Sequence, residues 1–226
     1  MKKIRIYLFF VAVTTVTAGC KLDNYDYPDA KIHGAFYDVE TLELVEQDII
    51  NGTVIEYVEE GYSSIETMVV KNDGTYRNNL IFSGQYTVTP VRGNFEPIEP
   101  QIVNIKGDFQ LDFFVKPYIR LKNVSISKSG DKVRASFWVE QTGYDNILRV
   151  GLFVSREPSV GNSIHTVKIE IPVGMRYTEE QQFTIIMDIP TQLKPVIGAS
   201  YFFRVGALID VPESKYNYAK AVRLEF

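Results

Sequence analysis

Few residues of this chain have the types and spacing that catalysis or metal binding requires. The chain has two histidines, His33 and His165, and one cysteine, Cys20. They form neither a His-x-x-x-His nor a Cys-x-x-Cys pair, so we predict no zinc site. No Gly-x-Ser-x-Gly elbow and no phosphate-binding glycine loop is present. Composition leaves a Ser/His/Asp triad open, but no local signature supports one, and we predict no metal and no cofactor.

Two carboxylate doublets, Glu59-Glu60 and Glu179-Glu180, are the remaining candidates for catalysis. Paired carboxylates hydrolyse glycosides when they flank the scissile bond. Both doublets lie beside turn-like residues, and adjacent residues of a strand point to opposite faces. We therefore interpret them as solvated surface charge and predict that the protein is not an enzyme, with a glycosidase or protease as the alternative.

The aromatic residues offer a better candidate for binding. They make up 13% of the chain, and most must fill hydrophobic cores. Trp138, the single tryptophan, lies in an alternating segment that places it on one strand face with polar neighbours, while Phe137 points the other way. An amphipathic indole on such a face suits the apolar side of a sugar ring. The predicted ligand-binding residues are Trp138, Arg134 and Glu140, extended by Phe202 and Arg204 if their strand is a neighbour. Packing of Trp138 against a loop or the other domain is the simpler interpretation, and both remain open.

The first twenty residues have the pattern of an export signal. Three basic residues precede an apolar stretch from Ile6 to about Val16, and the small residues Ala18 and Gly19 stand directly before Cys20. A basic start, an apolar core and a small-residue cleavage site are typical of a secretory signal, and this core is too short to span a membrane. The last residues resemble a bacterial lipobox, which implies cleavage before Cys20 and acylation of that cysteine. An unmodified thiol beside an ordinary cleavage site, or an uncleaved signal anchor, is the alternative.

The net charge of the chain and the segment after Cys20 indicate where the protein is located. The formal net charge is −4 and the isoelectric point is about 5.3, which argues against a nucleic-acid partner. With residues 1–19 as the signal peptide, residues 20–29 form a lipidated, acidic and proline-containing tether. Its acidic residues resemble the surface-export signals of Bacteroidetes lipoproteins, and a plain solvated linker explains them equally well. We predict a lipid-anchored outer-membrane protein exposed on the cell surface, with the periplasmic face as the other possibility.

The rest of the chain is typical of short β-strands separated by Gly, Pro, Asn and Asp. Only Thr41 to Ile50 approaches a helical period, and it ends at a turn signal. The pattern predicts an all-β protein with two consecutive β-sandwiches, 30–116 and 117–226, and the boundary at Lys116-Pro117. The predicted strands are 31–37, 53–58, 67–70, 75–77, 85–89, 101–105 and 108–115 in the first domain, and 118–127, 132–141, 147–155, 165–171, 182–189, 201–209 and 218–226 in the second.

Each half resembles a known kind of sandwich. Tyr201-x-Phe203-x-Val205-x-Ala207 resembles the sixth strand of a fibronectin type III domain, which implies that Tyr201 bonds back to the preceding loop. Phe137 stands where that family usually has a core tryptophan, so the relationship stays open. In the first half, segments 32–38, 72–76 and 82–88 resemble a transthyretin-like, carboxypeptidase-regulatory-type sandwich, with a tight turn at Asp73-Gly74.

Taken together, the lipobox, the acidic tether and the two sandwiches resemble a family of uncharacterised Bacteroidetes lipoproteins found with starch-utilisation-type (Sus-type) glycan systems. No enzymatic activity is established for that family. The resemblance implies a non-enzymatic accessory lipoprotein of a polysaccharide-utilisation system. Its implied partners are the membrane through Cys20, an oligosaccharide, and an outer-membrane receptor or glycan-binding lipoprotein. The alternative is a structural or protein-interaction module of an envelope or adhesion complex.

Overall fold

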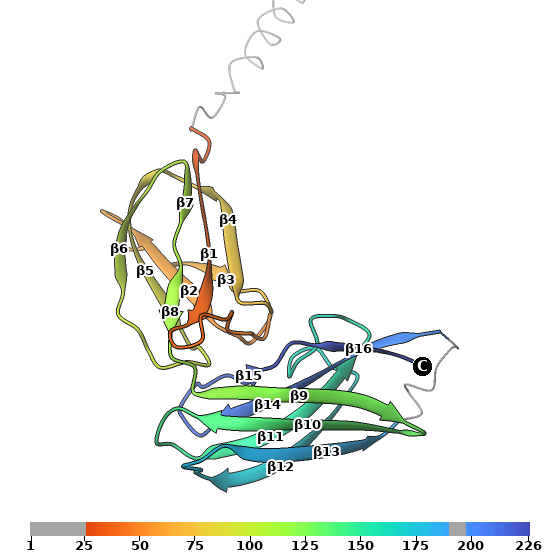
Figure 1. The fold of residues 1–226 in the computed structure, drawn as a ribbon. Helices are drawn as coiled ribbons and strands as arrows, with labels where there is room; N and C mark the ends of the chain where they lie inside the picture. The colour runs from red at the N-terminus through yellow and green to blue at the C-terminus, as the bar shows by residue number, and fades with distance from the viewer. Residues whose placement is uncertain (1–25, 190–197) are drawn as a thin grey trace, which may run out of the picture.

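The computed structural model describes residues 26–189 and 198–226. The predicted signal peptide and Cys20 lie outside these residues, as does the first part of the tether. Throughout the described part the regular elements are β-strands, arranged in four sheets that form two domains (Figure 1). No helix in this part is long and apolar enough to cross a membrane.

The N-terminal domain is a sandwich of two sheets. One sheet has the order β4-β1-β7, with β8 also paired to β1, and the other has the order β3-β2-β5-β6. Phe36, Phe113 and Phe95 stack between them with ring centroids 4.9 and 5.3 Å from Phe36, and the three rings are buried. The strands are β1 (Ala30–Asp38), β2 (Val54–Glu59), β3 (Glu66–Val69), β4 (Thr75–Ile81), β5 (Gly84–Val91), β6 (Gln101–Ile105), β7 (Asp108–Gln110) and β8 (Phe113–Val115).

The C-terminal domain is a second sandwich. Its smaller sheet has the order β13-β10-β9, and its larger sheet has the order β12-β11-β14-β15, with β16 also paired to β14. A buried core that includes Phe137, Leu152 and Phe203 fills the space between the sheets. The strands are β9 (Ile119–Ser129), β10 (Lys132–Gln141), β11 (Ile147–Ser155), β12 (Val167–Met175), β13 (Gln181–Asp188), β14 (Ser200–Ile209), β15 (Asn217–Tyr218) and β16 (Val222–Glu225).

The prediction of an all-β protein with two sandwiches is therefore confirmed, but two predicted strands are each divided. The segment 108–115 forms β7 and β8, because Asp112 Oδ1 accepts the backbone N–H of Ala35 at 3.0 Å in place of a ladder bond. At the same point the carbonyl oxygen of Leu111 lies 1.8 Å from where a Cβ of Gly34 would be, so only glycine fits there. The segment 218–226 likewise divides into β15 and β16.

Alternation correctly assigned the faces of the clearest strands. Val133, Ala135, Phe137 and Val139 of β10 are all buried, and so are the four alternate residues of β14 that begin at Tyr201. The Tyr201 hydroxyl accepts a hydrogen bond from Arg156 Nη2 at 3.3 Å. Much of the loop that precedes Tyr201 lies outside the described residues, so the predicted bond to that loop stays a prediction.

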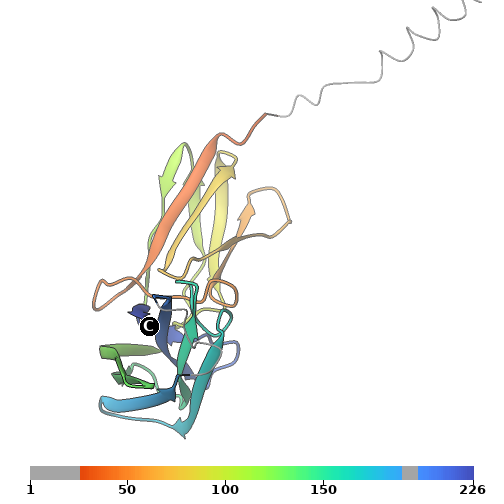
Figure 2. The ribbon, with the colours of Figure 1, turned by 90° about the vertical axis from the view of Figure 1, so that its right-hand side faces the viewer.

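The N-terminal domain stands on the outer face of the larger C-terminal sheet (Figures 1 and 2). Phe153, Tyr216 and Tyr218 form an aromatic cluster on that face, with Phe153 edge-on to both tyrosines. N-terminal loops reach this cluster through polar groups. Asp48 Oδ2, for example, accepts the backbone N–H of Ser163 at 3.0 Å and the Tyr218 hydroxyl at 3.3 Å. The two domains are thus joined by a packed and hydrogen-bonded interface.

Candidate functional site

Trp138 lies on the solvent face of the smaller C-terminal sheet. β10 is the central strand of that sheet, and Trp138 is opposite Lys122 on β9 and Gln182 on β13. Directly paired residues of antiparallel strands project to the same face, so these three side chains are neighbours. Trp138 is partly exposed, whereas the flanking Phe137 is fully buried in the core. A flat, partly solvated indole is therefore available on this sheet.

Hydroxyl and amide groups continue this face on one side of the tryptophan. Gln182 Nε2 donates to Ser136 Oγ at 3.2 Å, and Ser136 Oγ lies 3.4 Å from Thr184 Oγ1. Arg134, two residues before Ser136 on β10 and on the same face, is exposed and lies opposite Ile186. We name the outer-face residues Arg134, Ser136, Trp138, Glu140, Lys122, Gln182 and Thr184 the Trp138 face.

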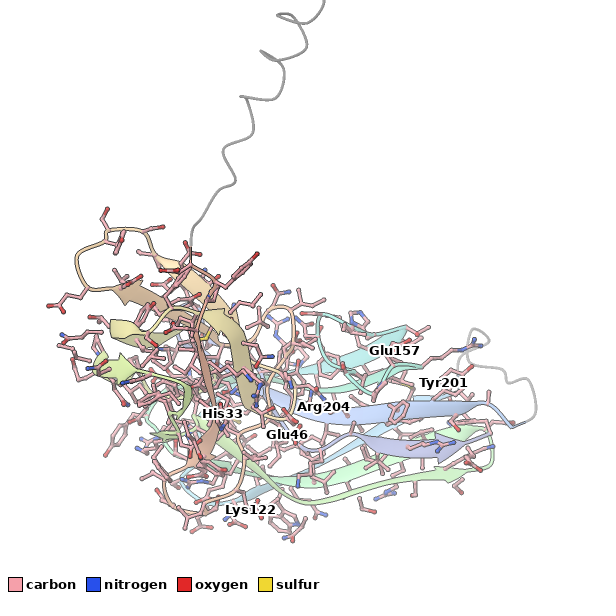
Figure 3. The ribbon with its side chains drawn as sticks, turned by 90° about the horizontal axis from the view of Figure 1, so that it is seen from above. His33, Glu46, Lys122, Glu157, Tyr201 and Arg204 are labelled. Carbon is pink, nitrogen blue, oxygen red and sulfur yellow. The ribbon has the colours of Figure 1, made fainter. Side chains whose placement is uncertain are left out.

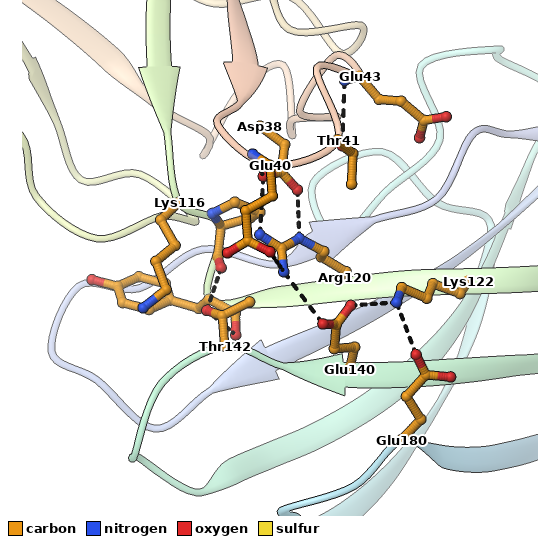
Figure 4. A network of polar contacts seen from close by, with 12 residues as sticks. Asp38, Glu40, Thr41, Glu43, Lys116, Arg120, Lys122, Glu140, Thr142 and Glu180 are labelled. Atoms are coloured by element: carbon orange, nitrogen blue, oxygen red, sulfur yellow. Dashed lines mark hydrogen bonds and ion pairs between the residues drawn. The ribbon is translucent and has the colours of Figure 1, made fainter.

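Charged groups continue the Trp138 face on the other side (Figure 4). Lys122 Nζ lies 2.6 Å from Glu140 Oε2 on β10 and 2.8 Å from Glu180 Oε1 just before β13, so one ammonium bridges two carboxylates. Its hydrogen bonds with Glu140 and then with Glu180 raise the pKa of Lys122 above its usual range. The ammonium therefore stays charged at neutral pH, and Glu180, whose side chain is 43% exposed, keeps oxygen lone pairs for hydroxyl donors.

The same network reaches the domain interface. Arg120, opposite Glu140 on β9, is buried and binds Asp38 at the end of β1 through Nε and Nη2, at 2.5 and 3.0 Å (Figure 4). Arg120 Nη1 also lies 3.0 Å from Glu40 and 3.4 Å from Glu140. Burial disfavours the charged form of Asp38, but hydrogen bonds from Arg120 and from the Glu40 backbone outweigh this and hold its pKa below the usual range. A bidentate arginine thus orders one end of the Trp138 face.

The expectation that Phe202 and Arg204 extend this face is wrong. β14 belongs to the larger sheet, so its outward residues point towards the N-terminal domain instead. Arg204 is 1% exposed and sits between the domains beside Glu46 (Figure 3). Phe202 is partly buried against the aromatic cluster of the interface. Neither side chain shares a surface with Trp138.

The two histidines, the other candidates for catalysis or metal binding, lie in different domains. His33 is half-buried on β1 with its Nδ1 3.0 Å from Asp108, and His165 is exposed just before β12. Among residues 26–189 and 198–226, no three His, Cys, Asp or Glu side chains are placed to hold a metal ion. The Trp138 face therefore offers stacking and hydrogen bonding to a ligand.

Sequence reasoning missed Lys122 and Gln182 as neighbours of Trp138. Their own strands alternate clearly enough to assign a face, but not to choose a partner strand or a register. For Arg204 a signal was present in the sequence. Its strand is apolar on both sides of the arginine, and such continuous runs are typical of strands buried on both faces.

Comparison with known proteins agrees with this architecture. Two family models match: "Protein of unknown function (DUF3823) N-terminal domain" over residues 30–116, and "Domain of unknown function (DUF3823_C)" over residues 119–223. No curated protein matches the chain significantly.

Several solved structures are similar to this chain over most of its length. A Bacteroides uniformis protein named "a putative carbohydrate binding protein" is 32% identical, with a TM-score of 0.79 over 88% of this chain and 100% of its own. DUF3823 family proteins from Parabacteroides merdae and Bacteroides ovatus are 22% and 21% identical, with TM-scores of 0.76 and 0.72. Each covers 88% of this chain, and the chain covers 100% and 99% of theirs. None of these three names describes an enzyme. The chain belongs to the DUF3823 family.

Proposed function

We propose that this protein is a non-enzymatic, saccharide-binding lipoprotein of the outer membrane that serves a Sus-type glycan uptake system. It is held by a lipid on Cys20 and binds glycans through the Trp138 face. The observation that carries the proposal is a partly exposed tryptophan on the solvent face of a sheet, with hydroxyl, amide and carboxylate groups around it. Pyranose rings have an apolar face for the indole and hydroxyls for the polar rim. The name of the 32% identical relative supports the same ligand class.

Titration of the purified chain with a panel of oligosaccharides tests the binding proposal. We expect Trp138→Ala to weaken binding of any positive glycan about five-fold, because an aromatic contact contributes about 1 kcal/mol beyond its buried area. Tyr144→Ala is the matched control, since Tyr144 is an exposed aromatic of the same domain that lies outside the Trp138 face. Absence of binding to every glycan, or equal affinity of the Trp138 variant and the control, would contradict the proposal.

The anchor has a separate test. Cys20→Ser removes the thiol that would carry the lipid and should move the protein from the membrane fraction to the soluble fraction of the cell. Protease treatment of intact cells then distinguishes the cell surface from the periplasmic face. Membrane retention of the serine variant would contradict lipidation at this residue.

A protein-docking role is the second candidate, favoured by one edge strand. Among residues 26–189 and 198–226, β6 pairs with β5 alone and leaves one row of backbone groups open, and Ile102 on it is exposed. An open, apolar edge can pair with a strand of a partner. Co-purification from detergent-solubilised membranes in the absence of glycan, lost on Ile102→Lys, would support this role over saccharide binding.

A further inference from the structure

A cleft lies in the N-terminal domain, where the edges of its two sheets face each other. β3 ends one sheet and β4 ends the other, and the cleft between them has a volume of about 340 Å³. Small-ligand pockets begin at about this size. Four aromatic rings line it, from Tyr57, Tyr62, Phe82 and Tyr86. None of them belongs to the Trp138 face, which is in the other domain.

The inner rings of the cleft are held in place. Tyr57 accepts a hydrogen bond from Asn78 Nδ2 at 3.2 Å, and the Tyr86 hydroxyl donates to the Phe82 carbonyl at 3.0 Å. Burial and then the negative charge of Glu59 raise the pKa of Tyr86 to about 12, so this donor stays protonated. The outer wall is more open, since Tyr62 is 70% and Phe82 45% exposed. The cleft is thus a rigid aromatic floor with rings available to a ligand at its mouth.

The charged residues that line the cleft are all acidic. Glu59 and Glu66 line it, and no Lys, Arg or His is among its lining residues. Within the described part of the chain neither carboxylate forms an ion pair, and Glu66 Oε1 accepts a hydrogen bond only from Ser64, at 3.2 Å. By contrast, every carboxylate of the Lys122 network has a cationic partner. Two uncompensated carboxylates among tyrosine faces favour a positively charged ligand.

We propose that the cleft between β3 and β4 binds a saccharide that carries free amino groups. A protonated amine gains from the negative faces of the tyrosines and from both carboxylates, and the sugar ring covers Tyr62 and Phe82. The ligand class rests on the proposed saccharide-binding function, whereas the site and its charge preference are independent of it.

The cleft lies at the end of the N-terminal domain where the described chain enters β1. Ala30 is paired with Ile81, which lines the cleft, and Asp29 Oδ1 accepts the backbone N–H of Ser83 beside Phe82 at 2.7 Å. The C-terminal domain is attached at the opposite end, near Asp38 (Figure 1). A ligand in this cleft therefore cannot be confused with one on the Trp138 face when variants of the two sites are compared.

Two probes that differ in their amino groups test the proposal: the glucosamine hexamer, whose free amines can be charged, and its fully N-acetylated, neutral counterpart. Calorimetric titration of the purified chain at about pH 6, below the ordinary pKa of an α-amino group, keeps the amines charged. We expect the amine form to bind and Tyr62→Ala to weaken it about five-fold. Glu66→Gln should weaken it about two- to five-fold, with the difference reduced by salt. Tyr144→Ala and Glu99→Gln are the matched controls, since Tyr144 is 84% exposed and Glu99 is exposed and has no ion pair with any residue that the structure describes.

The outcomes separate this inference from the proposed function. Weaker binding of the amine form by the Tyr62 and Glu66 variants, with Trp138→Ala unchanged, supports the cleft. Loss only in Trp138→Ala overturns the cleft and retains the proposed function. Equal affinity for both probes, with Glu66→Gln unchanged, overturns the charge preference, and no binding of the amine form overturns the site.

Discussion

Replacing Arg204 with methionine is expected to weaken the interface between the two domains, which we call the joint. The guanidinium donates to four backbone carbonyls, those of Gln47, Asn72, Val160 and Ala219, at 2.8–3.1 Å. Gln47 and Asn72 belong to the N-terminal domain and the other two residues to the C-terminal domain. Methionine keeps most of the volume and removes every one of these bonds.

The magnitude follows from the burial of the partners. Arg204 pairs with Glu46, and the exposed fractions of the two side chains are 1% and 11%. Burial raises the pKa of Glu46, and the charge of Arg204 partly offsets this. Removing one member of such a pair leaves the other buried and uncompensated, which costs about 3–5 kcal/mol. For a domain assembly of this size that corresponds to a fall in melting temperature of about 6–20 °C.

Differential scanning calorimetry is the suitable assay, because it reports both the midpoint and the number of transitions. With the joint intact we expect the two domains to unfold together. In Arg204→Met the transition should move down and broaden or separate into two, since the domains then share fewer contacts. The double variant Arg204→Met, Glu46→Leu should recover part of the loss, because no buried charge is left without a partner.

Arg223→Met is the matched control on the neighbouring strand β16. Arg223 is 59% exposed and pairs with the exposed Glu225 and Ser200. Surface pairs of this kind contribute about 0–1 kcal/mol, so its melting temperature should change little. A fall in Arg204→Met no larger than that of Arg223→Met would refute the conclusion that Arg204 stabilises the joint.

Two further predictions concern the N-terminal domain. The pKa of Asp38 is lowered in the folded protein, so its stabilising effect is complete above the unfolded pKa of about 3.9 and is lost as the pH falls through the lower folded pKa. Asp38→Asn should therefore reduce the urea midpoint at pH 7 and flatten its decline towards pH 3, and an unchanged pH profile would contradict the Arg120 pairing. Gly74 and Gly61 both have positive φ, +81° and +86°, but only at Gly74 would a Cβ meet backbone, the Val45 carbonyl oxygen at 2.6 Å. Gly61→Ala should cost about 1 kcal/mol and Gly74→Ala clearly more in urea denaturation, and equal costs would exclude the steric explanation.

Much of the candidate site was already implied by local pattern. Alternation along β10 was enough to separate Phe137 from Trp138, because successive side chains of a strand point to opposite faces whatever the partners are. The same argument placed Arg134 and Glu140 beside the tryptophan. The partners Lys122 and Gln182 depend on strand order and register, which are properties of the whole sheet.

The cleft between β3 and β4 could not be predicted from local sequence pattern either. Its six aromatic and carboxylate residues come from three separate parts of the chain, 57–66, 80–82 and Tyr86. No spacing rule connects them, because they meet only where two sheets are stacked and their edge strands face each other. Glu59 was weighed as half of a carboxylate doublet, whereas its neighbours in space are tyrosines.

The amino-acid sequence by itself determined that this is an all-β protein of two sandwiches and which side chains of each clear strand face inwards. These properties follow from strand propensity, turn residues and a period of two, all of which act over a few residues. Only the tertiary structure decided that β14 belongs to the sheet that carries the N-terminal domain, so that Arg204 became a buried link between domains instead of a ligand-binding residue. Sheet membership and domain contact are set by packing between residues more than a hundred positions apart, such as Glu46 and Arg204. The apolar run around Arg204 indicates a strand buried on both faces, but local pattern does not identify the residues that cover it.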